Sequence, residues 1–98
     1  MIDIRKQFAG CGYLIYESED DTTNIVCRHG HIYADGEHLF AALYNGTRSQ
    51  ILRLRKLGEP IMDGDFGELT IRFEPRQFPA VARVMKPRQR DLAARQVA

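Results

Sequence analysis

Alternation of apolar and polar residues is clearest over residues 68–74, and this pattern predicts a β-strand. Leu69, Ile71 and Phe73 fall on one face of that strand, whereas charged residues and a threonine occupy the other. One face is therefore expected to be buried and the other hydrated. Three more strands are predicted upstream, in short segments rich in aromatic or β-branched residues: 13–17, 25–27 and 31–34.

Residues 37–44 admit two interpretations. Asp35 and Gly36 are typical of a hairpin turn, which would make the segment a returning strand. Asp35 can equally cap a helix, because its carboxylate accepts backbone N–H bonds. The segment places several large apolar residues at helical spacing, and the Asn45-Gly46 pair would end a helix. We therefore predict a helix over residues 37–44.

A second helix is predicted over residues 47–57. Thr47 and Gln50 have the spacing of a capping box, in which each side chain accepts a hydrogen bond from the other residue's backbone N–H. Leucine and arginine alternate over residues 52–55, so a strand is the competing interpretation. The capping residues favour the helix.

A third helix is predicted after Pro75, because apolar residues recur there at helical spacing from Phe78 onward. Residues 59–66 are rich in turn-forming residues and predict a connection. The predicted order of elements is thus β-β-β-α-α-β-α. This order indicates an α+β fold, with a small, mostly antiparallel sheet and helices packed on one of its faces.

Length and composition indicate one small globular domain. The chain has 98 residues, with near-average hydrophobic and charged content. Residues 1–87 are expected to form a single compact domain, and residues 88–98 a basic, mobile tail. No apolar run approaches the roughly 20 residues that cross a bilayer, and the opening residues lack a signal-peptide stretch. We expect a cytoplasmic protein with no membrane partner.

Basic residues are concentrated toward the carboxyl end. Residues 1–40 hold three bases and seven acids, whereas six bases and one acid follow Pro75. Arginine binds phosphate through paired hydrogen bonds, so a non-catalytic nucleic-acid-binding protein is the first functional hypothesis. Its net charge of only +1 is small for such a role. The residues expected to contact the phosphate backbone are Arg53, Arg55, Arg83, Lys86, Arg88 and Arg90.

A protein-interaction module, acting as an adaptor, an inhibitor or a homodimer, is the alternative hypothesis. Acidic and basic halves could pair between copies, and a partner strand could extend an edge of the sheet. This hypothesis involves no nucleic acid.

Catalytic and metal sites are not expected. Neither Ser18 nor Ser49 lies in a Gly-x-Ser-x-Gly motif, and no glycine-rich phosphate loop is present. Cys27, His29 and His31 would share one face of a continuous strand, and such residues bind zinc. Their spacing matches no zinc signature, and a turn at His29 would separate them. We therefore predict no metal, no cofactor and no enzymatic activity.

Overall fold

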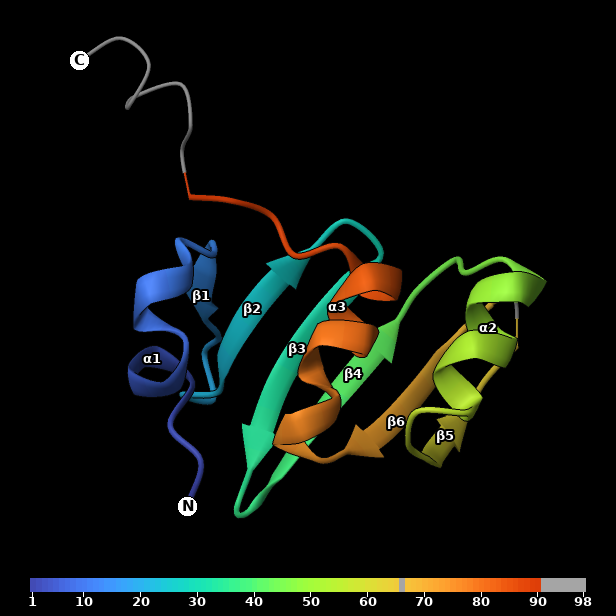
Figure 1. Cartoon of the computed structure of the whole chain (residues 1–98), viewed down its shortest axis with the longest axis horizontal. Coiled ribbons are helices and arrows are strands. Elements are labelled where there is room, and N and C mark those ends of the chain that lie inside the picture. Colours follow the sequence, from blue (N-terminus) through green and yellow to red (C-terminus); the bar gives the residue numbers. More distant parts are fainter. Residues whose placement is uncertain (66, 91–98) are drawn as a thin grey trace, which may run out of the picture.

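A sheet of six antiparallel strands organises the part of the chain that the computed structural model describes, residues 1–65 and 67–90 (Figure 1). The strands lie in the order β1-β2-β3-β4-β6-β5. They are β1 (Ile15–Glu17), β2 (Thr23–Cys27), β3 (Gly30–Asp35), β4 (His38–Leu43), β5 (Glu59–Asp63) and β6 (Leu69–Phe73). The helices are α1 (Ile4–Gln7), α2 (Arg48–Arg55) and α3 (Phe78–Met85), with 3-10 turns η1 (Ala9–Cys11) and η2 (Pro75–Gln77).

The α+β class and the antiparallel sheet are confirmed, but the predicted order of elements is wrong. Residues 38–43, predicted as a helix, form β4, and part of the predicted connection 59–66 forms β5. The short helix α1 was not predicted either. Four residues are too few to show a helical period, so the sequence pattern carried no signal for α1.

Strand β4 forms because both of its edges find hydrogen-bonding partners. It pairs with β3 through a hairpin in which Asp35 lies opposite His38, and its other edge pairs with β6. Gly36 adopts a positive φ of 65° in this turn, a conformation that glycine accepts without steric cost. The apolar residues that suggested a helix also include Leu39 and Leu43, which are spaced as alternate residues of a strand. The hairpin interpretation of Asp35-Gly36 is therefore the correct one.

The elements with strong local signals form as predicted. Thr47 and Gln50 make the expected capping box, since the Thr47 hydroxyl accepts from Gln50 N at 3.2 Å and Gln50 Oε1 accepts from Thr47 N at 2.8 Å. Helix α2 includes residues 52–55, so the strand interpretation of that segment is wrong. The alternating segment 68–74 contains β6, and α3 covers the apolar residues from Phe78.

The core lies on one face of the sheet. Ile25, Ile32, Ala41 and Ile71 are consecutive register partners across β2, β3, β4 and β6, and all four are fully buried. Residues from each helix join the same cluster: Ile4, Leu54 and Val81. The helices are seen on this side of the sheet in Figure 1.

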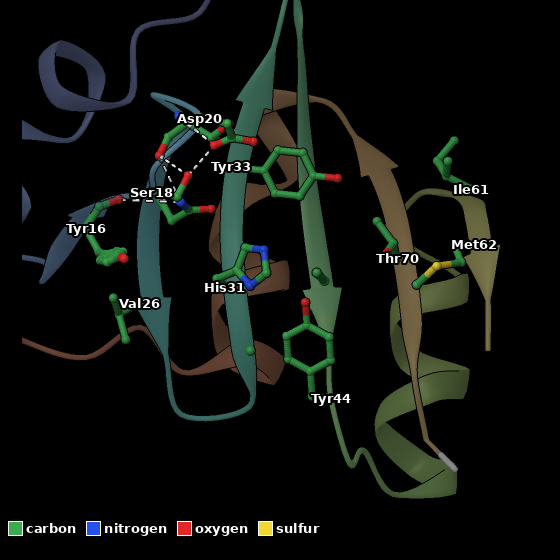
Figure 2. A pocket seen from close by; sticks show the side chains of 14 residues that line it. Tyr16, Ser18, Asp20, Val26, His31, Tyr33, Tyr44, Ile61, Met62 and Thr70 are labelled. Atoms are coloured by element: carbon green, nitrogen blue, oxygen red, sulfur yellow. Dashed lines mark hydrogen bonds between the residues drawn. The ribbon is translucent and has the colours of Figure 1, made fainter. Parts of the chain in front are cut away.

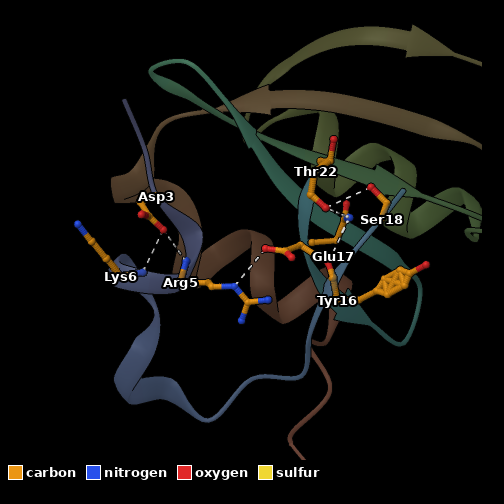
Figure 3. Close-up of polar contacts among 8 residues, drawn as sticks. Asp3, Arg5, Lys6, Tyr16, Glu17, Ser18 and Thr22 are labelled. Atoms are coloured by element: carbon orange, nitrogen blue, oxygen red, sulfur yellow. Dashed lines mark hydrogen bonds and ion pairs between the residues drawn. The ribbon is translucent and has the colours of Figure 1, made fainter. Parts of the chain in front are cut away.

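Helix α1 is fastened to the first strand by polar contacts at the surface (Figure 3). The Asp3 carboxylate caps α1 by accepting from Arg5 N at 3.0 Å and from Lys6 N at 3.3 Å. The Arg5 guanidinium forms an ion pair with Glu17 of β1 at 3.5 Å. These contacts leave Arg5 and Glu17 partly neutralised at this edge of the fold.

The chain returns to the sheet after α3. Arg88 N donates to Val26 O and Leu14 N donates to Arg88 O, both at 2.8 Å, and Arg90 N donates to Gly12 O at 2.7 Å. Residues 91–98 of the predicted mobile tail lie outside the described residues, so the boundary at residue 88 stays a prediction. The longest helices in the described part have eight residues, and none of them is long and apolar enough to span a membrane.

Candidate binding face on the open side of the sheet

The sheet has a second face that the helices do not cover. Figure 2 looks onto this side, with α2 and α3 behind the strands. Alternation along each strand means that the neighbours of the buried residues point to this side. We call it the open face and define it by the following residues: Tyr16, Asn24, Val26, His31, Tyr33, Phe40, Ala42, Tyr44 and Thr70.

A broad groove of about 830 Å³ runs along the open face. It extends from Tyr16 on β1, across the middle strands, to Ile61 and Met62 on β5. Tyr16, Ile61 and Met62 are each about half exposed, as is Tyr44 just after β4. Large apolar side chains thus remain accessible across nearly the full width of the sheet.

Aromatic rings form the floor at the centre of the groove. The His31 ring lies 5.6 Å from the centroid of Tyr33 and 5.6 Å from that of Tyr44. Tyr33 stacks on Phe40 with ring centroids 5.1 Å apart and planes 10° from parallel. His31 and Tyr33 lie on β3 and Phe40 on β4, which are paired at the centre of the sheet, and Tyr44 directly follows β4. The backbone under the floor is therefore held by strand pairing. Such a floor needs little rearrangement to accept a ligand.

Two polar side chains of the open face, Thr70 and His31, form no hydrogen bond within the described part of the chain. Thr70 is 6% exposed, and its hydroxyl is not a buried unsatisfied group but faces the groove (Figure 2). The imidazole of His31 is likewise without a hydrogen bond to any described group. Burial lowers the pKa of His31, so its ring is neutral at pH 7 and offers one donor and one acceptor. An apolar floor with a few such groups is the usual composition of a binding site.

The loop between β1 and β2 places a carboxylate at the edge of the groove. Asp20 lines the groove, and Ser18 Oγ donates to its carboxylate, as does Thr22 N at 3.2 Å. Hydrogen bonds from the Ser18 side chain, and then from Thr22, lower the pKa of Asp20. Ser18 Oγ also lies 3.2 Å from Thr22 O, so the loop closes on itself. The carboxylate is therefore both ionised and held in place.

The Asp35 carboxylate places a second negative charge near the aromatic floor. Asp35 follows Tyr33 by two residues on β3, so both side chains point to the open side. Burial and, to a lesser degree, repulsion from Tyr44 and Asp35 raise the pKa of Tyr33. Tyr33 therefore stays a neutral phenol, in a field made negative by Asp35.

The six basic residues predicted to bind nucleic acid lie elsewhere, and none of them is among the described residues that line the groove. They fall on α2, on α3 and on the segment after α3: Arg53, Arg55, Arg83, Lys86, Arg88 and Arg90. Arg55 forms an ion pair with Asp63 of β5. Lys86, Arg88 and Arg90 are exposed on the segment that follows α3, where Lys86 ends the helix in a left-handed conformation with a φ of 57°. These three residues are near one another in the sequence, whereas Arg53 and Arg55 lie on a separate element, α2.

The three candidate metal ligands do not converge. Cys27 lies in the core, 5% exposed, whereas His31 on the next strand is opposite Val26 and points to the open face. His29 lies in the turn between those strands. Burial raises the pKa of the Cys27 thiol to about 12, so the thiol is protonated near pH 7. Within the described part of the chain, no three Cys, His, Asp or Glu side chains form a metal-binding group.

Comparison with known proteins gives no assignment: no family model, no curated protein and no solved structure matches this chain.

The sequence pattern did not predict the open face. Its signal was the aromatic series Tyr33, Phe40 and Tyr44, but the last two were assigned to a helix. Because residues 38–43 form β4, Tyr33, Phe40 and Tyr44 lie on the same face of the sheet as His31.

Proposed function

We propose that this protein is a non-catalytic protein-interaction module that binds a segment of a partner protein on the open face. The observation that carries the proposal is the aromatic floor at His31, Tyr33 and Tyr44, which lines the groove on the side of the sheet that no described helix covers. Tyrosine is enriched where proteins bind one another, because it offers a large apolar surface with a polar end.

The shape of the groove supports a protein segment as the ligand. Six strands span about 24 Å at a spacing of ~4.8 Å, which is the length of about seven residues of extended chain. A segment lying across the floor would hydrogen-bond to the unpartnered Thr70 hydroxyl and His31 imidazole. A phosphate-rich ligand is disfavoured, because Asp20 and Asp35 place negative charge on this side.

The test is selection of binding peptides from a displayed library of random dodecamers against the wild-type protein. Selected peptides are expected to lose about tenfold or more in affinity for the Tyr44→Ser variant, since central aromatic residues carry much of the binding energy at interfaces. Leu52→Ser is the matched control, because Leu52 is 49% exposed on α2 and Tyr44 is 44% exposed on the open face. Affinities are measured by fluorescence anisotropy.

Two results would count against the proposal. One is a selection that enriches no binder above background. The other is a set of binders that lose affinity for Leu52→Ser but not for Tyr44→Ser. Circular dichroism of both variants shows that the fold is intact, so that a loss at Tyr44 reports on contact with the peptide.

Nucleic-acid binding is a second candidate, favoured by three exposed bases, Lys86, Arg88 and Arg90, within the short segment after α3. If this segment contacts a phosphate backbone, the affinity for a single-stranded oligonucleotide should fall as salt rises, by about 0.7 logarithmic units per tenfold salt for each phosphate neutralised. A Lys86→Gln/Arg88→Gln double variant is expected to reduce that slope, and Arg48→Gln/Lys56→Gln, which removes two exposed charges outside the predicted contact residues, is the matched control. An affinity that is absent, or that does not change with salt, rejects this candidate.

A further inference from the structure

The structure points to the chemistry of the partner. Resting on the proposed protein-binding role, we infer that the bound segment is anchored by a basic side chain, lysine or arginine, seated on the ring of Tyr33 with its charge facing Asp20 and Asp35.

Charge complementarity is the first support for a basic anchor. Among the described residues that line the groove, Asp20 is the only one with a fixed charge at pH 7. Asp35 adds a second negative charge on the same side of β3. Arg72 projects from β6 toward this side, but its guanidinium is engaged in an ion pair with Glu59. The field at the floor is thus negative, and a cation is attracted to it.

The aromatic floor is the second and independent support. The face of an aromatic ring carries negative charge density and attracts the ammonium or guanidinium group of a ligand. Tyr33 stacks on Phe40 and lies beside His31, so its ring is fixed between two neighbours. Lysine and arginine also have long apolar stems, which would lie against the rings while the charged end reaches the carboxylates.

Neutral His31 completes the subsite. Protonated, its ring would repel a basic anchor, but burial lowers its pKa and keeps it neutral at pH 7. The Thr70 hydroxyl lies on β6, two strands from His31, where it is available to the backbone of the bound segment. The subsite therefore combines rings, carboxylates and backbone-binding groups on adjacent strands.

The experiment uses three acetylated and amidated octapeptides in which valine alternates with lysine, glutamine or glutamate. Binding of each to the full chain is followed by two-dimensional NMR titration. The lysine peptide is expected to bind about tenfold more tightly than the glutamine peptide, from the sum of one cation–π contact and two ion pairs. The glutamate peptide is expected to bind more weakly than either, because its charges face Asp20 and Asp35.

Variants separate the subsite from general charge attraction. Asp35→Asn is expected to weaken the lysine peptide about threefold and to leave the glutamine peptide unchanged. Glu19→Gln is the matched control, because it removes the same charge from a residue that, unlike Asp35, is not among the groups that raise the pKa of Tyr33. Asp20→Asn gives a second measurement. Asp35 is the more decisive site, because its carboxylate makes no hydrogen bond or ion pair to any described group, whereas Asp20 also closes its loop.

The ring is tested by two changes at Tyr33. Tyr33→Phe keeps the ring face and should retain the preference for lysine, whereas Tyr33→Leu should lose most of it. The inference is overturned if the glutamine or glutamate peptide binds as tightly as the lysine peptide, or if Glu19→Gln weakens binding as much as Asp35→Asn. Library peptides that need Tyr44 but carry no base also reject the basic anchor, while the interaction role survives. Failure to obtain any binder that depends on the open face rejects both.

Discussion

Replacing Gly30 with alanine is expected to destabilise the protein by about 4 kcal/mol, since overpacking and a strained positive φ each cost about 1–3 kcal/mol. Gly30 is the first residue of β3 and has a φ of 145°. A Cβ atom there would lie 1.9 Å from the carbonyl oxygen of Ala42 and 3.2 Å from Cε of Met85. The first of these contacts is with backbone on the paired strand β4, so it cannot be relieved by turning a side chain.

The matched control for this prediction is Gly36→Ala. Gly36 also has a positive φ, 65°, but no heavy atom lies within 4 Å of the Cβ that alanine would add. Gly36→Ala is therefore expected to lower the free energy of unfolding only by the cost of the left-handed conformation, about 1–2 kcal/mol. Urea unfolding followed by circular dichroism gives both values, with unchanged m-values required for a direct comparison. Equal losses for the two variants would show that β3 and β4 do not approach as closely at Gly30 as the structure indicates.

Truncation of Leu54 to alanine is the second large expected effect, a loss of about 2–5 kcal/mol. Leu54 is fully buried and is the one residue of α2 in that class. Its removal leaves a cavity where α2 meets α3 and β6, because the backbone on either side is held by separate hydrogen bonds. Alanine is a good helix former, so the loss reports on packing rather than on helix propensity.

Leu52→Ala serves as the control for burial. Leu52 lies two residues away on the same helix and is 49% exposed, so its truncation is expected to cost about 0.5 kcal/mol or less. Both variants remove the same atoms from the same helix, and the difference between their unfolding free energies isolates the core contact. Both free energies are measured by thermal and urea unfolding. If the two variants lose similar amounts of unfolding free energy, the position of α2 on the core face is contradicted.

These two sites also bear on the proposed function. Gly30 lines the groove as well as packing β3 against β4, so its replacement should disturb the strand pair that carries the aromatic floor. Leu54 lies on the far side of the sheet, and its truncation should weaken the fold without changing the residues that line the groove. Peptide affinity of the folded fraction should therefore fall for Gly30→Ala and persist for Leu54→Ala.

The sequence by itself determined the elements whose signals are local. The alternation of Leu69, Ile71 and Phe73 specified β6 and its buried face, because a period of two is typical of a strand. The expectation that the other face is hydrated is wrong at Thr70, which is also buried. Thr47 and Gln50 specified where α2 begins, since a capping box is formed within four residues of chain. The α+β class followed from such segments, each of which carries its own structural preference.

Tertiary structure alone decided the rest, including the candidate site. The segment containing Leu39, Phe40 and Leu43 fits both a helical and a strand period, and pairing with β3 and β6 on its two edges selected the strand. That pairing placed Phe40 beside Tyr33, and the pairing of β2 with β3 sent Cys27 and His31 to opposite faces. Contacts between strands depend on residues distant in the sequence, so a local pattern could not reveal which aromatic side chains would share an uncovered face.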